Sequence, residues 1–172
     1  QNNNPNEVIL NMTRILKLNA TDSYDLTLGE IEGRKQVKES VDFLRKYIPG
    51  FEECYLVSTG PQIGIRESRR IKGVYTLTAE EMMDNVMFPD AIAMGGYPFD
   101  IHSPDGASND DKFLKPGTYY SIPYRIMVNH QVENLITTGR CVSAEHEAAS
   151  SLRVSPIAMA LGHAAGVAAA VT

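Results

Sequence analysis

The residues of this chain that could do chemistry are mostly arginines, and the clearest of them follows a glycine. Gly139-Arg140 comes directly after an apolar run, and the planar fork of an arginine donates two parallel hydrogen bonds to a phosphate. A second basic cluster lies at residues 64–71 (GIRESRRI), where we predict that Arg66 meets an acidic ligand or substrate. The sequence does not distinguish Arg66 from the two arginines that follow it. A tight turn with a surface arginine, and surface ion pairs, are the structural alternatives.

Proton transfer has its candidates in the middle of the chain. His102 lies in YPFDIHSP, and Tyr124-Arg125 lie in IPYRI. Histidine exchanges a proton near neutral pH, so His102, Tyr124 and Arg125 join Arg66 as predicted catalytic residues on the substrate side. A histidine held by structural hydrogen bonds is the alternative for His102. The four histidines lack metal-ligand spacing, and we therefore predict no metal site.

The last quarter of the chain predicts the elements that would position the glycine turn. Residues 135–138 are predicted as a buried strand that ends at this turn, and a polar loop follows. Ser155 as N-cap and Pro156 in the first helical position predict a helix to the end of the chain. Gly162 and Gly166 lie four positions apart on one face of this helix, which favours close packing.

Elsewhere the patterns predict two helices, several short strands and a long irregular segment. Capping boxes at residues 27–30 and 78–81 predict a helix to about Tyr47 and a short helix to about Val86. Branched and aromatic residues predict strands at 8–10, 54–58, 74–77 and 119–127. Glycine, proline and aspartate dominate residues 88–123, and 103–112 is predicted to be a surface loop.

Composition is that of a globular protein with mixed secondary structure, which predicts the α/β (α+β) class. The 172 residues are 43% hydrophobic and 22% charged, enough for one domain with a sizeable core. A net charge of −5 argues against a nucleic-acid binder. Cys54 and Cys141 are predicted to be buried free thiols rather than a disulfide. The final helix is shorter than a membrane span and contains His163, so we predict no span.

Residues 134–170 resemble the C-terminal flavin-contacting motif of a bacterial family of FAD-dependent oxidoreductases. The shared pattern is an Asn-Leu strand, Gly-Arg, a serine-rich loop, Arg-Val, a small residue with proline, and Ala-Leu-Gly-x-Ala-Ala-Gly. Three earlier blocks agree in the same order, namely NMTR at 11–14, GIRESRRIKGVYTLT at 64–78 and FPDAIAMGGYPFDIHSPDG at 88–106. The resemblance therefore spans nearly the whole chain.

The resemblance implies FAD as the cofactor and a place in the glutathione-reductase-like flavoprotein superfamily. It implies a two-domain FAD/NAD(P)-binding-type fold in which cofactor and substrate domains are interleaved. Residues 1–131 would then be mainly the substrate or cap portion, with 64–71 near the flavin, and 132–172 the C-terminal part of the FAD-binding domain. The cofactor-binding residues that it implies are Gly139, Arg140, Ser143, Ala144, Arg153, Val154 and Pro156.

One part of the family pattern is absent from the sequence. Such flavoproteins begin with a strand, a GxGxxG turn and a helix that hold the FAD pyrophosphate, and no GxGxxG occurs here. We therefore expect the chain to be the C-terminal fragment of a longer protein, inactive without the N-terminal FAD-binding segment that is its partner.

The predicted function of the parent enzyme is hydride transfer from a small organic substrate to flavin. A non-redox carbohydrate-active lyase or hydrolase that reuses the fold is the alternative, with a sugar cleft lined by Tyr97, Tyr119, Tyr120 and Tyr124. A binding module without catalysis is a third. An oligomer is compatible with the sequence, which leaves the substrate, the electron acceptor and the cytoplasmic or periplasmic compartment open.

Overall fold

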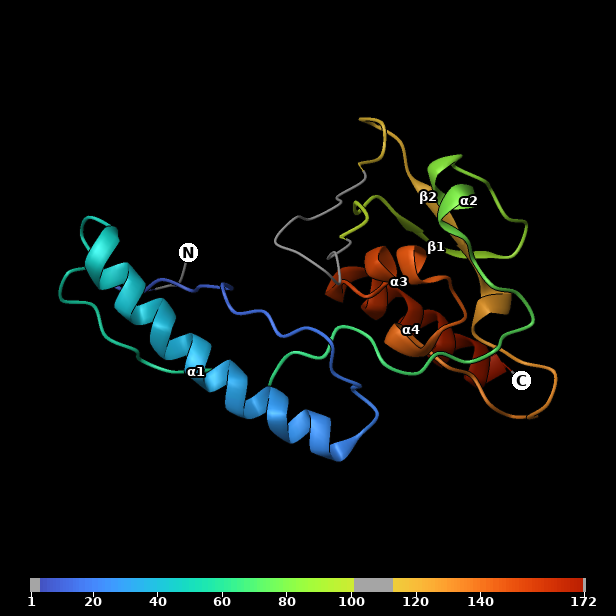
Figure 1. Ribbon diagram of the computed structural model, residues 1–172. Helices are drawn as coiled ribbons and strands as arrows, with labels where there is room; N and C mark the ends of the chain where they lie inside the picture. Colours follow the sequence, from blue (N-terminus) through green and yellow to red (C-terminus); the bar gives the residue numbers. More distant parts are fainter. Residues whose placement is uncertain (1–3, 101–112, 172) are drawn as a thin grey trace. The chain divides into compact units, whose positions relative to one another are not determined.

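The computed structural model describes residues 4–100 and 113–171, and the chain divides into two compact units at residues 1–65 and 66–172 (Figure 1). The elements are α1 (Ser23–Tyr47), α2 (Ala79–Met83), β1 (Ala91–Gly95), β2 (Tyr120–Pro123), the 3-10 helices η1 (Tyr124–Ile126) and η2 (Gly139–Cys141), α3 (His146–Leu152) and α4 (Ser155–Val171). Helices and a sheet in one chain agree with the α+β class. The predicted division at 131/132 concerns contact with a cofactor and stays a prediction.

In the first unit, the N-cap of α1 lies five residues earlier than predicted. Asp22 is the N-cap, because its carboxylate accepts hydrogen bonds from the N–H groups of Tyr24 at 2.9 Å and Asp25 at 3.1 Å. Thr27, the predicted cap, lies inside the helix and donates its hydroxyl to the carbonyl of Ser23 at 2.9 Å. The prediction of Thr27 as the cap is therefore wrong, whereas the C-terminal end of the helix is as predicted.

Two buried glycines bring the rest of the first unit against α1. A Cβ atom at Gly29 would lie 2.8 Å from Cδ1 of Ile63, and Gly33 is buried one turn further on. Figure 1 shows extended chain on both sides of the helix. The strands predicted at 8–10 and 54–58 do not form, since both segments are extended but are paired with no other strand of the described residues.

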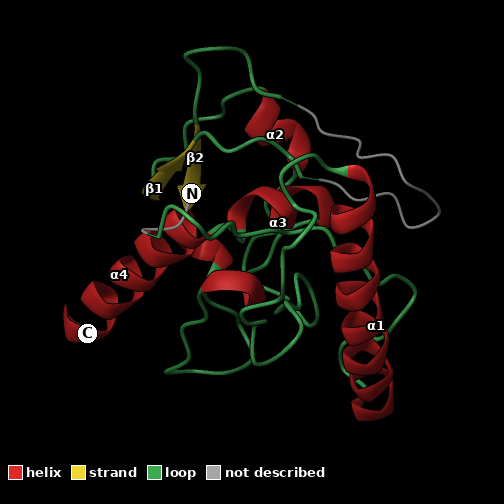
Figure 2. Ribbon diagram, turned by 90° about the vertical axis from the view of Figure 1, so that its left-hand side faces the viewer, coloured by secondary structure: helices red, strands yellow, loops and turns green. Residues whose placement is uncertain are grey.

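In the second unit, β1 and β2 form an antiparallel pair beside α4 (Figure 2). Gly95 pairs with Tyr120, and a Cβ atom at Gly95 would lie 2.4 Å from the Tyr120 ring. Only a glycine therefore fits beneath this ring. The strand predicted at 119–127 is confirmed for Tyr120–Pro123 alone, because the chain turns into η1 after Pro123, which has no N–H to donate.

The second capping box is confirmed at the start of α2. The Glu81 N–H donates to the Thr78 hydroxyl at 3.2 Å, and the Thr78 N–H donates to the Glu81 carboxylate at 3.0 Å. The helix ends at Met83, three residues before the predicted end. Its buried Met82 joins a core built from β1, β2, α3 and α4, whose largest fully buried side chains include Phe99, Tyr120 and Leu161.

Segments 71–77 and 141–145 lie side by side and carry the chain into the functional region. The Leu77 N–H donates to the carbonyl of Ser143 at 3.1 Å. Gly73 allows this approach, because a Cβ atom there would lie 2.7 Å from Cβ of Ser143. The strand predicted at 74–77 is reduced to one bridge, between Leu77 and Ala144, since the two segments pair at isolated positions.

Four further expectations are wrong, three for the last quarter of the chain and one for the two cysteines. Residues 135–138 form no strand. The Thr137 N–H donates a hydrogen bond to the carbonyl of Met127 at 2.8 Å. The predicted polar loop contains helix α3, and α4 begins at Ser155 itself. Cys54 is half-buried and Cys141 is exposed, so both thiols are free but neither is buried. Apolar neighbours in sequence do not fix the burial of a side chain.

None of the described helices is by itself long and apolar enough to cross a membrane. Helices α3 and α4 reach the required length and composition only together, across a bend of 89°.

Candidate functional site

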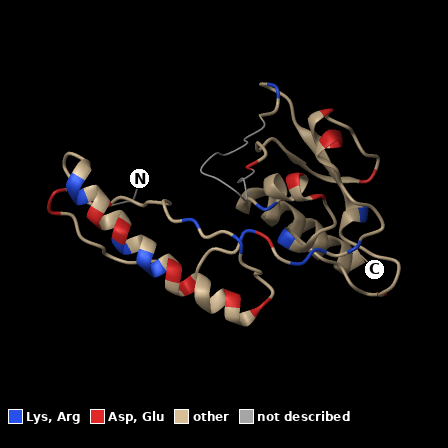
Figure 3. Ribbon diagram, in the orientation of Figure 1, with Lys and Arg blue, Asp and Glu red and all other residues tan. Residues whose placement is uncertain are grey.

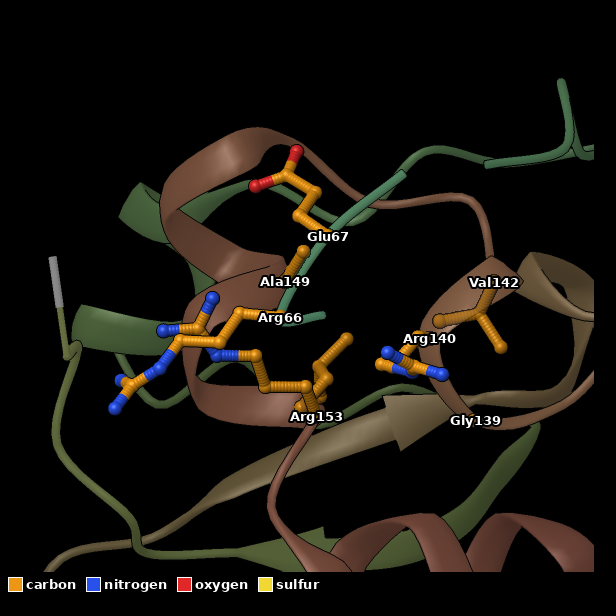
Figure 4. Close-up of a pocket in the computed structure, with 8 residues that line it drawn as sticks. Arg66, Glu67, Gly139, Arg140, Val142, Ala149 and Arg153 are labelled. Carbon is orange, nitrogen blue, oxygen red and sulfur yellow. The ribbon is translucent and has the colours of Figure 1, made fainter. Parts of the chain in front are cut away.

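A small pocket in the second unit collects residues that are far apart in the sequence (Figure 4). Its walls come from the start of the unit, from η2 and from α3. The lining residues are Arg66, Glu67, Gly139, Arg140, Val142, Ala149, Leu152 and Arg153. The structure therefore brings together four residues that the sequence nominated separately: Arg66, Gly139, Arg140 and Arg153.

Asp100 links two of these arginines. Its Oδ2 atom lies 2.6 Å from Nη1 of Arg66 and 3.4 Å from Nη2 of Arg153. Nη2 of Arg153 also donates to the Asp100 carbonyl at 3.0 Å. The Arg153 side chain is only 13% exposed. Asp100 was missed by sequence reasoning, because nothing in its neighbourhood along the chain indicates a distant arginine as its partner.

The pocket concentrates positive charge around Arg153. Burial lowers the pKa of the Arg153 guanidinium, and the nearby charge of Arg66 lowers it further, while Asp100 and Glu67 oppose both effects. An arginine remains protonated in a protein, so the lowered pKa reports an unfavourable environment for its charge. An added anion would relieve this cost, and the pocket is therefore suited to an anionic ligand.

The turn at Gly139 offers its backbone to such a ligand. Gly139 has φ +69°, a left-handed conformation that favours glycine, and a Cβ atom there would meet nothing within 4 Å. The hydroxyl of Thr138, the preceding residue, is buried without a hydrogen-bond partner among the residues that the structure describes, and Thr138 does not line the pocket. A buried polar group without a partner is costly. The arginines and the open backbone at Gly139 together form a donor set that fits a phosphate-bearing group.

Glu67, which also lines the pocket, contacts two basic side chains. One carboxylate oxygen accepts a hydrogen bond from Arg70, and the other lies 2.6 Å from Nδ1 of His146. Figure 4 shows the Glu67 carboxylate pointing away from the guanidinium groups of Arg66 and Arg153. Sequence reasoning assigned no role to this pair, and only the position of His146 next to the predicted cofactor loop pointed to it.

Four predicted cofactor-binding residues do not line this pocket. Ser143 and Ala144 lie in the core, where they are 2% and 5% exposed, and Oγ of Ser143 lies 2.9 Å from Oγ1 of Thr76. Val154 is half-buried before α4, and Pro156 is exposed in its first turn. Direct cofactor contact by these four residues stays a prediction.

Tyr124 and Arg125 lie in η1 and do not line the pocket either. The Arg125 guanidinium stacks over the rings of Tyr75 and Phe88, with centroid distances of 4.4 Å and 5.3 Å. Its Nε atom lies 3.8 Å from Oδ2 of Asp90. The local contacts of Arg125 are thus those of a packed cation, and its predicted catalytic role stays a prediction.

The remaining predictions concern His102, the tyrosines of a sugar cleft and metal binding. His102 lies outside the described residues. Tyr120, one of the four tyrosines expected along a sugar cleft, is fully buried with its hydroxyl 2.7 Å from Oγ of Ser151, so it lines no cleft. Within residues 4–100 and 113–171, no three histidine, cysteine, aspartate or glutamate side chains are grouped so that they could hold a metal ion.

Comparison with known proteins bears on the same residues. A family model described as FAD dependent oxidoreductase matches residues 1–172. No curated protein matches the chain, and no solved structure does. The family match indicates that FAD is the cofactor and that the function is a flavin-dependent redox reaction. A phosphate-bearing cofactor agrees with the donor set of the pocket.

Proposed function

This chain belongs to the FAD dependent oxidoreductase family, and we propose that the enzyme it forms transfers a hydride from a small organic substrate to FAD. The observation that supports this best is the pocket at which Arg66, Arg140 and Arg153 meet beside the open turn at Gly139. Asp100 pairs with Arg66 and Arg153, and a phosphate would add a second anion to a pocket that holds three guanidinium groups. The two phosphates of FAD supply such an anion.

The pocket residues divide between cofactor and substrate in this proposal. Arg140 and Arg153 would hold the phosphates, and Gly139 would let the backbone come close. Arg66, whose side chain is 42% exposed, would meet the substrate. Bound FAD supplies the two-electron acceptor for the hydride. The protein contributes binding, orientation and the exclusion of water.

A further FAD-binding unit belongs to the same proposal. The sequence holds no GxGxxG turn, although the family chemistry needs a tight backbone cradle for the pyrophosphate. We infer that this cradle comes from a segment outside these residues, with cofactor and substrate portions interleaved and divided at 131/132. The rest of the parent enzyme would supply the remaining contacts to the substrate.

The visible absorption spectrum of protein made from the complete gene tests this proposal. We expect a flavin spectrum that loses its colour when secondary alcohols, 2-hydroxy acids or amines are added without oxygen. A colourless protein that also refuses added FAD would overturn the proposal. Unsaturated products formed from a polysaccharide without flavin reduction would favour a carbohydrate-active enzyme instead, and a protein without turnover a binding module.

Variants of the arginines test which residues hold the cofactor. Arg140→Ala should weaken FAD binding about 10-fold or more, since a charge-assisted hydrogen bond contributes roughly 1.5–3 kcal/mol. Arg69→Ala is the matched control, because Arg69 is exposed in the same basic segment and does not line the pocket. Equal affinities in the two variants would remove Arg140 from the site. Titration calorimetry with FAD measures both.

A further inference from the structure

We propose that residues 54–58 of the first unit pair with a further β-strand, and that this strand is an apolar and acidic segment of the parent enzyme outside residues 1–172. The proposal goes beyond the proposed function and takes from it only that the chain is part of a longer protein. It is carried by the unpaired backbone of an exposed apolar segment and by a groove between this segment and α1.

The extended segment that follows α1 is attached to this helix at its two ends. Nε of Arg45 donates to the carbonyl of Cys54 at 2.8 Å. Nη1 of Arg34 donates to the carbonyl of Gly60 at 3.3 Å. Between these points, the N–H and carbonyl groups of residues 55–58 have no hydrogen-bond partner in the part of the chain that the structure describes. An extended segment with free donors and acceptors is a template for pairing with another strand.

The side chains of this segment are those of a strand whose faces are uncovered. Tyr55, Leu56 and Val57 are 76%, 52% and 63% exposed, and aromatic and branched residues favour strands. Successive side chains of an extended chain point to opposite faces. Since Leu56 lines the groove, Tyr55 and Val57 lie on the face opposite to it. An exposed apolar segment with an unpaired edge is rarely left uncovered in a native protein.

A second extended segment flanks α1 (Figure 1). The apolar residues 8–10 are exposed, and the backbone groups of residues 8–13 likewise have no hydrogen-bond partner among residues 4–100 and 113–171. A Cβ atom at Gly33 of α1 would lie 3.2 Å from Cδ1 of Ile15 and 3.3 Å from Cγ2 of Ile63. The chain that follows each extended segment therefore packs on the same face of α1, and a layer of strands on this face would border both segments.

The first unit has almost no core of its own. Of residues 4–65, only Gly29, Gly33 and Leu44 are buried, and the other apolar side chains are partly or largely exposed. A surface of this kind is normally covered permanently rather than by a transient partner. A second copy that paired about a twofold axis through residues 54–58 would leave residues 8–13 open. We therefore assign the strand to the polypeptide of the parent enzyme itself.

The groove between α1 and the segment indicates which side chains the strand carries. Its volume is about 500 Å³, and it is lined by Arg34, Val37, Lys38, Val41, Asp42, Arg45, Leu56 and Thr59. The groove thus holds three cations and one carboxylate beside apolar side chains. Lys38 has no ion pair with the described residues, so its charge is available to a partner. Apolar and acidic side chains complement this lining.

Hydrogen–deuterium exchange of the protein from its complete gene tests the pairing. Successive N–H groups of a strand point to opposite edges, so every second amide of residues 55–58 should join the new ladder. Overlapping peptides read by mass spectrometry should show these amides exchanging about 100-fold or more slowly than unpaired amides. Glu52 and Glu53, in the exposed turn directly before the segment, are the fast-exchanging control. Exchange of all four amides as fast as in this turn would overturn the proposal.

A carbodiimide cross-link tests the acidic side chains. The reagent joins an amine to a carboxylate in contact with it, so Lys38 should couple to an aspartate or glutamate outside residues 1–172, which mass spectrometry identifies. Lys38→Arg keeps the charge but removes the amine, and it should abolish this product without changing the exchange of residues 55–58. Lys35→Arg is the matched control, because Lys35 does not line the groove and pairs with Glu32 at 3.7 Å. A Lys38 that couples to no such carboxylate would overturn the acidic partner.

The mass of the cross-linked protein identifies the source of the strand. A Lys38 product at the mass of one polypeptide on a denaturing gel is expected for a strand of the same chain. A product confined to the mass of two polypeptides would mean a second copy and overturn the assignment. Exchange and cross-linking are both read without flavin. A colourless protein with protected residues 55–58 would therefore overturn the proposed function alone, and a flavin-binding protein with unprotected residues 55–58 would overturn this inference alone.

Discussion

Helices α1 and α4 each carry two glycines four positions apart, and the two pairs have opposite surroundings. On α1, a Cβ atom at Gly29 would lie 2.8 Å from Ile63. On α4, Cβ atoms at Gly162 and Gly166 would meet nothing within 4 Å. The same spacing is therefore closed by the chain in one helix and left open in the other. A glycine pair indicates that close packing is possible, and only the neighbours decide whether it happens.

The two helices also differ in their content of charged residues. Figure 3 shows acidic and basic residues along the whole of α1, whereas α4 has none. Met159 and Val171 of α4 are nevertheless 73% and 79% exposed. The helix α1 of the first unit is thus charged, and the helix α4 of the second unit is apolar and partly exposed. The closest packing in the second unit lies in its core, at Gly95 and Tyr120. We expect changes of packing to have their largest effects in that core.

The largest expected effect is that of Gly95→Ala in the second unit. The new Cβ atom would lie 2.4 Å from the Tyr120 ring, which is fully buried and held through its hydroxyl by Ser151. Overpacking of this kind should lower the free energy of unfolding by about 3 kcal/mol. Gly96→Ala is the matched control, since its nearest neighbour would lie at 3.8 Å. Urea denaturation compares them, and equal midpoints would contradict the packing of this strand.

The stability of the same core should depend on alkaline pH, because it contains the buried Tyr120. Burial raises the pKa of Tyr120 to about 12, and the hydrogen bond with Ser151 opposes this. Because the raised pKa favours the neutral phenol in the folded state, its stabilising effect is complete below pH 10 and is lost as the pH rises from 10 to about 12. The loss should reach about 2–3 kcal/mol.

Tyr120→Phe should reduce this alkaline loss, measured by urea denaturation at several pH values. Part of it should remain, since a hydrogen bond to Glu81 raises the pKa of Tyr75 as well. Tyr55→Phe is the control from the first unit, because Tyr55 is 76% exposed. An identical pH dependence in Tyr120→Phe and the wild type would mean that Tyr120 is not buried as described.

The smallest expected effect separates the two glycine pairs directly. Gly162→Ala should stabilise the chain by about 0.8–1 kcal/mol, the difference in helix propensity between the two residues. In Gly29→Ala the same gain is offset by overlap with Ile63. Thermal unfolding followed by circular dichroism compares the two variants. Equal shifts of the melting temperature would contradict the predicted difference between the two glycine pairs.

Features that depend on a few neighbouring residues could be predicted from the sequence. The capping box of Thr78 and Glu81 formed as expected, because its partners are three residues apart. The same reasoning failed at Thr27, because Asp22, five residues upstream, is the cap. Strand predictions failed more often, at 54–58 for example, since a strand needs a partner that its own residues do not specify.

The sequence by itself determined the family, the cofactor and the arginines of the pocket, because these depend on residue types and their order along the chain. Only the tertiary structure decided that Arg66 and Arg153 share Asp100 and that Glu67 lies beside His146. It also decided that Ser143 lies in the core rather than on the pocket wall. Contacts between residues far apart in sequence follow from how the segments pack, which no local pattern encodes.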